Sequence, residues 1–155
     1  MQDFKNLKVW GKAHQLTLEI YSATRKYPRD EIFALTSQIR RASSSIAANI
    51  AEGAGRRSRK EFTHFLAIAI GSVSEVEYFL ILGRDLKYIS QDDFTRINGL
   101  ANETKKMLIS FLLKVERGIG GTLSFAIFNL LLTTHNLLQM TFTSLLYLDC
   151  PTPGQ

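Results

Sequence analysis

Four basic residues surround one predicted turn, and they are the part of this sequence best suited to bind a ligand. Arg56, Arg57, Arg59 and Lys60 directly follow a short turn at 53–55. A guanidinium can hold a phosphate through two parallel hydrogen bonds, and clustered basic side chains are typical of nucleic-acid-binding surfaces. The cluster therefore predicts contacts with the phosphates of RNA or DNA. A solvated charged turn is the alternative.

A second basic pair, Arg40 and Arg41, lies about four helical turns earlier. We include both among the predicted nucleic-acid-binding residues, as a patch separate from the turn. The sequence has no RNP-type aromatic motif, zinc finger or helix-turn-helix signature, so we expect contacts mainly with the nucleic-acid backbone.

A metal site is the next chemistry to consider, because Glu61 and His64 have the Glu-x-x-His spacing of di-iron carboxylate bundles. Such a site needs the motif on two helices. His14 has no glutamate three residues before it, and His135 lies in the C-terminal tail. His64 also falls on the side of its predicted helix away from the apolar stripe. We therefore expect an exposed histidine and no metal.

No pattern of catalytic groups emerges either. Cys150 stands in the last six residues with no histidine nearby, and the serine run at 43–45 has no paired base. Glu75 and Glu77 are two residues apart, so on a helix they point in roughly opposite directions. Neither a phosphate-binding loop nor a dinucleotide motif is present. We predict no catalytic residue, no cofactor and no enzymatic activity.

The elements that must position the basic cluster are predicted to be helices. Apolar residues recur at three- and four-residue steps over 7–27, 36–52 and 59–88. The same spacing continues in a fourth stretch, which begins after polar N-cap residues at 90–93 and ends at residue 117. Short connectors join these stretches. The pattern predicts an all-α fold, an antiparallel up-down-up-down four-helix bundle.

Two features at the junction of the second and third predicted helices concern local structure. The glycines at 53–55 predict a left-handed C-cap, and Ser58 with Glu61 fits a capping box. Small residues outside the apolar stripe of 36–52 permit another helix or another subunit to approach closely, although the helix propensity of alanine would also explain them.

The predicted helix 59–88 is apolar around most of its circumference. A monomeric four-helix bundle does not bury that much apolar surface, so the pattern favours a homo-oligomer, or coverage by the tail. The surplus side chains lie outside the stripe expected to face the core. They are Ile68, Ile70, Tyr78, Phe79, Ile81 and Leu82.

Composition divides the chain at residue 117. All 19 lysines and arginines and 13 of the 14 acidic residues lie in 1–117, a net charge of 19 − 13 = +6. From Gly118 onward Asp149 is the only charged residue. We therefore assign 1–117 to the bundle and 118–155 to an uncharged, apolar C-terminal extension, either a fifth helix or poorly ordered.

Cellular setting follows from the cysteine count and the N-terminus. A single cysteine excludes an internal disulfide framework, and residues 1–12 lack the apolar core of a secretory signal. We expect a cytoplasmic protein. Residues 122–148 are long enough to span a bilayer, but Asn129, His135, Asn136 and Gln139 near their middle disfavour that alternative.

Several short motifs within residues 4–114 follow one family pattern. They are Phe4-x-x-Leu7-x-Val9-Trp10, Tyr27-Pro28, Leu35-Thr36-x-Gln38-Ile39-Arg40-Arg41-Ala42, Ser45-Ile46-Ala47-Ala48-Asn49-Ile50-Ala51-Glu52-Gly53, Gly55-Arg56, Glu61-Phe62 with Phe65-Leu66, and Ala69-x-Gly71-Ser72-x-x-Glu75. In these the chain resembles the bacterial four-helix-bundle proteins encoded within intervening sequences of 23S ribosomal RNA genes. It is also similar to the accessory variability protein of diversity-generating retroelements.

The resemblance implies a basic homo-oligomeric bundle, a pentamer, that has no known catalytic residues and works with nucleic acid. Our leading hypothesis is therefore a non-enzymatic bundle that binds RNA or DNA. The alternative is a protein-interaction scaffold whose partner is a protein such as a reverse transcriptase. The tail from residue 118 lies outside the family pattern.

Overall fold

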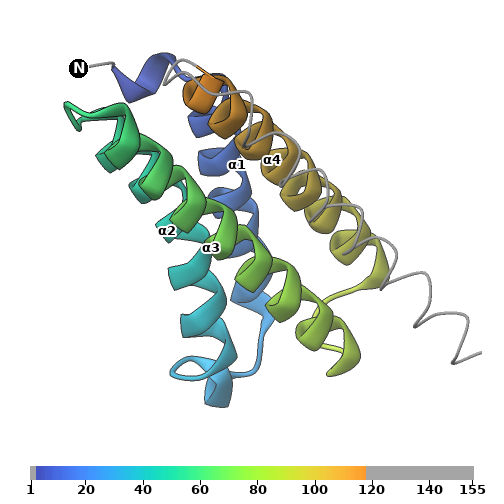
Figure 1. The fold of residues 1–155 in the computed structure, drawn as a ribbon. Helices are drawn as coiled ribbons and strands as arrows, with labels where there is room; N and C mark the ends of the chain where they lie inside the picture. Colours follow the sequence, from blue (N-terminus) through green and yellow to red (C-terminus); the bar gives the residue numbers. More distant parts are fainter. Residues whose placement is uncertain (1–2, 118–155) are drawn as a thin grey trace, which may run out of the picture. The chain divides into compact units, whose positions relative to one another are not determined.

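The computed structural model describes residues 3–117, and they form four α-helices joined by short connections (Figure 1). The helices are α1 (Lys8–Ala23), α2 (Leu35–Ala54), α3 (Arg59–Asp85) and α4 (Gln91–Arg117). Short 3₁₀ turns precede α1 (Phe4–Asn6) and connect it to α2 (Thr24–Lys26 and Arg29–Glu31). The predicted all-α four-helix bundle is confirmed, and the predicted extension at 118–155 lies outside the described residues.

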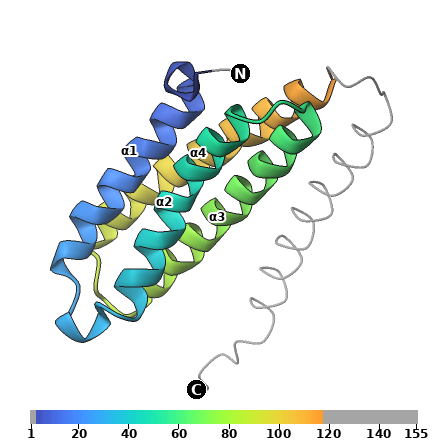
Figure 2. The same ribbon diagram turned by 90° about the vertical axis from the view of Figure 1, so that its left-hand side faces the viewer.

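Consecutive helices run in opposite directions (Figure 2). Each packs against the helix before it in the chain, and α1 packs against α4 to close the bundle. One end of the bundle therefore gathers the start of α1, the end of α2, the start of α3 and the end of α4. We call it the α2–α3 end, and the other the far end.

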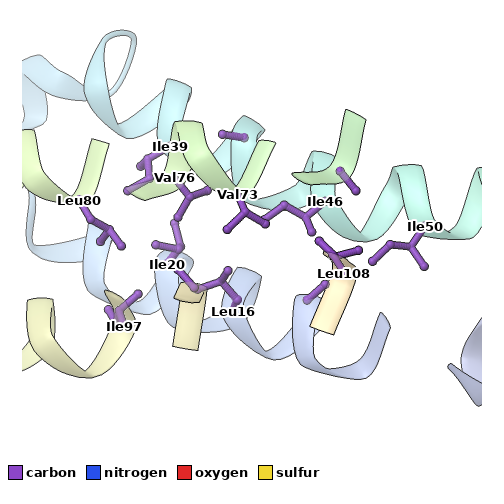
Figure 3. Close-up of a cluster of buried hydrophobic side chains, with 14 of the residues drawn as sticks. Leu16, Ile20, Ile39, Ile46, Ile50, Val73, Val76, Leu80, Ile97 and Leu108 are labelled. Atoms are coloured by element: carbon purple, nitrogen blue, oxygen red, sulfur yellow. The ribbon is translucent and has the colours of Figure 1, made fainter. Parts of the chain in front are cut away.

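The core lies along the axis of the bundle and is aliphatic (Figure 3). All four helices contribute side chains at three- and four-residue spacing, as the sequence periodicity predicts. Removing this apolar surface from water is the main driving force for folding. Fully buried members include Leu16, Ile20, Ile39, Ile46, Ile50, Leu66, Val73, Val76, Leu80, Ile97 and Leu108.

The junction between α2 and α3 has the predicted N-cap at Ser58 but not the predicted C-cap. The Ser58 hydroxyl accepts a hydrogen bond from the Glu61 amide at 3.3 Å, as expected of an N-cap. The left-handed C-cap, however, is wrong: α2 continues to Ala54 and Gly55 has a right-handed φ of −78°. Gly53 lies inside the helix, where the side chains of Phe62 and Phe65 leave no room for a Cβ atom.

The small residues of α2 allow close packing inside the bundle. The hydroxyls of Ser45 and Ser72 lie 3.0 Å apart and join α2 to α3. On the other side, the Thr17 hydroxyl of α1 donates to the backbone carbonyl of Ser43 at 2.9 Å. Both links require the backbone of α2 to lie close to its neighbours, α3 at Ser45 and α1 at Ser43.

The third helix leaves part of its apolar surface in contact with solvent. Ile68, Tyr78 and Ile81 are 40%, 59% and 41% exposed, whereas Ile70, Phe79 and Leu82 are half-buried. By length and composition α3 is the one helix of residues 3–117 that could cross a membrane, a criterion that core helices of soluble proteins also meet.

A polar bridge links α1 to α4 at the far end and predicts an acid-sensitive stability. Arg96 donates hydrogen bonds to Glu19 at 2.6 Å and to Asp93 at 3.0 Å. The bond from Arg96 holds the pKa of Asp93 below its ordinary value of 3.8. A lowered folded-state pKa contributes stability above the unfolded-state value, which is lost as the pH falls through the folded-state value. Asp93→Asn should therefore lower the melting temperature at neutral pH, and the deficit should disappear well below about pH 4.

Melting temperatures measured by thermal unfolding from neutral pH to well below about pH 4 test this prediction. Asp92→Asn is the matched control, because Asp92 is exposed and forms no ion pair or side-chain hydrogen bond within residues 3–117. If the melting temperature of Asp93→Asn is lower by the same amount at every pH, the charge of the Asp93 carboxylate does not contribute to stability.

Candidate nucleic-acid interface

The structure places the predicted pair Arg40 and Arg41 at the far end, near the start of α2. The Arg40 guanidinium donates to the Thr24 hydroxyl at 2.8 Å and stacks 4.9 Å from the ring centre of Tyr21. These contacts engage Arg40 in joining α2 to α1. Arg41 is exposed and donates to Gln38 at 2.7 Å. The pair is separate from the other four basic residues, as predicted, and Arg41 is its more accessible member.

The other four predicted residues lie together at the α2–α3 end, and all four are exposed. Arg56 forms an ion pair with Glu52, one turn back on α2, and its guanidinium stacks 5.0 Å from the ring centre of Phe65. Neither Arg57 nor Lys60 forms an ion pair within residues 3–117. Their charges therefore remain available to a ligand.

The fold brings three further lysines to the same end, which the sequence pattern does not predict. Lys8 at the start of α1 faces Lys106 and Lys114 of α4 across a hollow of about 530 Å³. All three are exposed and form no ion pair within the described region. Leu7 and Phe111 contribute to its apolar lining. Nearly a hundred residues separate Lys8 from Lys106, so only the antiparallel topology reveals the group.

A second hollow, of about 740 Å³, lies between the start of α3 and the end of α4. We call it the α3–α4 groove. Basic, acidic and aromatic side chains share its wall. The lining residues are Arg56, Lys60, Glu61, Thr63, His64, Phe65, Ala67, Leu112 and Glu116.

The α3–α4 groove has two aromatic residues, His64 and Phe65. His64 is exposed, as predicted, and its ring centre lies 5.8 Å from that of Phe65. Phe65 follows the apolar periodicity of residues 59–88 that predicts a core position, but it is only half-buried. Its ring contacts both the Arg56 guanidinium and the His64 imidazole. Within residues 3–117, no three histidine, cysteine or acidic side chains are grouped to hold a metal ion.

Cations dominate the electrostatics of the α2–α3 end. The basic residues gathered there include Lys8, Arg56, Arg57, Arg59, Lys60, Lys106 and Lys114. Glu52 is paired with Arg56, and Glu61 and Glu116 line the α3–α4 groove. Such an excess of positive charge attracts polyanions and raises their rate of association.

The chain is similar to known proteins in both sequence and structure. A family model described as 23S rRNA-intervening sequence protein matches residues 5–110. The chain is also similar to a protein of unknown function from the S23 ribosomal protein family of Bacteroides thetaiotaomicron VPI-5482, known from a crystal structure. The two are 31% identical, the alignment covers 67% of this chain and 94% of that one, and the TM-score is 0.62. No curated protein matches this chain.

Proposed function

The chain belongs to the family of 23S rRNA-intervening sequence proteins, and from this premise we propose that it is a non-enzymatic, homo-oligomeric bundle that binds the backbone of RNA or DNA. The single observation that carries the proposal is the gathering of unpaired cations at the α2–α3 end. Arg57 and Lys60 on one side, and the lysines around the Lys8 hollow on the other, are exposed without carboxylate partners in the described region.

The geometry suits a polyanion better than a small nucleotide. The cations come from three separate segments, at the start of α1, the α2–α3 turn and the end of α4. A phosphate chain presents regularly spaced charges that can meet several such segments at once, and each contact releases counterions. We assign the contacts to Arg56, Arg57, Arg59 and Lys60 together with Lys8, Lys106 and Lys114, with Arg41 at the far end as a separate patch.

Self-association is the second part of the proposal. The exposed apolar side chains of α3, Ile68, Tyr78 and Ile81, favour burial against a second copy. A ring would repeat the basic end around its axis and multiply the phosphate contacts. The family resemblance suggests five copies. The same face would instead bind a partner protein in the scaffold alternative, and we propose a cytoplasmic setting for either.

A salt titration of binding to a labelled structured RNA tests the proposal. The logarithm of affinity should fall steeply and linearly with the logarithm of salt concentration. Arg57→Ala/Lys60→Ala should reduce the magnitude of that slope by about 1.4–1.8, because each phosphate contact contributes about 0.7–0.9. Fluorescence anisotropy at several salt concentrations provides the measurement.

The matched control is Arg25→Ala/Arg29→Ala, which removes the same charge from exposed residues of the far end that form no ion pair within residues 3–117. Its slope should equal that of the parent protein. Equal slopes in both double variants would remove the α2–α3 end as the binding surface. Capture of a protein partner that survives nuclease and high salt, without RNA binding, would favour the scaffold.

A further inference from the structure

We propose that the α3–α4 groove is a base-binding subsite, so that the nucleic acid bound at the α2–α3 end is single-stranded there and inserts one unstacked base against His64 and Phe65. This inference rests on the proposed function and deepens it by naming the class of nucleic acid. Phosphate contacts alone would require only the exposed cations of the turn. Such contacts do not explain why a hollow with aromatic walls lies beside these cations.

The groove is open to solvent. It is a surface hollow of about 740 Å³, so a base can lie against its wall without being enclosed. Lys60 stands at its wall, one helical turn before His64 and on the same side of α3. A strand whose phosphate contacts Lys60 can therefore place the attached base inside the groove.

The aromatic and guanidinium groups provide the surface for stacking. The imidazole of His64 is exposed, and the Phe65 ring is covered on one side by the guanidinium of Arg56 at 5.0 Å. Single-stranded nucleic acids are held by such rings and guanidinium planes, on which bases stack irrespective of sequence. In a duplex the bases already stack on one another and are not available to these groups.

The carboxylates of the groove determine which part of the nucleotide enters. Glu61 and Glu116 both line it, and neither forms an ion pair within the described part of the chain. They repel a phosphate from the interior and confine it to the cations of the rim. Carboxylates accept hydrogen bonds and donate none, so they suit the amino and imino N–H groups of a base edge.

The test compares the full chain binding to an unstructured labelled RNA of about 12 nucleotides rich in adenine and cytosine, and to the same strand in a duplex. His64→Ala should weaken binding of the single strand by roughly five- to a hundredfold, the range of one lost base stack. Duplex binding and the salt slope should not change, because no phosphate contact is removed. Phe65→Leu, which keeps an apolar side chain at the core edge, should weaken single-strand binding in the same direction.

The control is Phe33→Ala, which removes an aromatic ring that is 93% exposed in the connection before α2 at the far end. Its affinities should equal those of the parent protein. Steep salt dependence with equal affinity for single strand and duplex, and no effect of His64→Ala, would overturn the subsite while leaving the proposed function intact. Absence of salt-dependent binding to either probe would overturn both.

Discussion

Gly53→Ala is expected to lower the free energy of unfolding, because overpacking a well-packed site costs about 1–3 kcal/mol, more than the helix propensity that alanine gains. An added Cβ atom would lie 2.7 Å from Cδ2 of Phe62 and 2.9 Å from Cβ of Phe65. The Phe62 ring cannot swing away freely, because it packs edge-on against Phe111 of α4 at 5.5 Å. The Cβ atom of Phe65 is fixed to the backbone of α3, so the helices themselves must separate.

Helix propensity acts in the opposite direction and is smaller. Alanine is favoured over glycine in a helix interior by roughly 0.5–1 kcal/mol. Gly99→Ala isolates this contribution, because no heavy atom lies within 4 Å of the Cβ position at Gly99 in α4. That variant should gain stability by about the same 0.5–1 kcal/mol.

Urea unfolding followed by circular dichroism measures both variants at one protein concentration. The midpoint should fall for Gly53→Ala and rise for Gly99→Ala, with unchanged slopes. A Gly53→Ala protein as stable as the parent would contradict the close approach of α3 to α2 at this position.

Tyr78→Glu is expected to convert the proposed oligomer to a monomer. Tyr78 is 59% exposed on the outer face of α3, near the exposed Ile81. In an interface built on this face a buried carboxylate without a partner costs several kcal/mol per copy, and a symmetric ring would incur that cost at every interface. In the monomer the carboxylate would face water, so folding itself should change little.

Light scattering coupled to size-exclusion chromatography provides the solution mass. Tyr78→Phe should retain the mass of the parent protein, because the ring is preserved. Leu18→Glu places a carboxylate on an equally exposed position of α1, 57% accessible to solvent, and should also leave the mass unchanged. A parent protein that is already monomeric, or a Tyr78→Glu protein of unchanged mass, would show that α3 does not form the interface.

Self-association should raise the affinity of the protein for nucleic acid. Binding of one phosphate chain to several copies makes every contact after the first intramolecular, which raises the overall affinity without any new contact. If Tyr78→Glu produces a monomer, its nucleic-acid affinity should therefore fall although its basic end is unaltered. Arg57→Ala/Lys60→Ala should weaken binding while the oligomer remains intact.

Local patterns in the sequence were sufficient to predict the helices and the basic turn. Apolar periodicity reports which side of a helix meets a core, and the N-cap at Ser58 depends on residues three positions apart. For the same reason the exposure of His64, the surplus apolar surface of α3 and the separation of Arg40 from Arg56 could be predicted. Each depends on positions within one helix or one turn.

The features that depend on contacts between helices became visible only in the tertiary structure. Gly53 was predicted to end α2, yet it lies inside the helix. Two phenylalanines of α3 occupy the space that a side chain at this position would need. Lys8 and Lys106 line the same hollow only because α1 and α4 pack side by side. Phe65 borders the α3–α4 groove where Leu112 and Glu116 of α4 form the opposite wall. Periodicity carries no information about which helices become neighbours or how closely they approach, so these features arise only when the bundle packs.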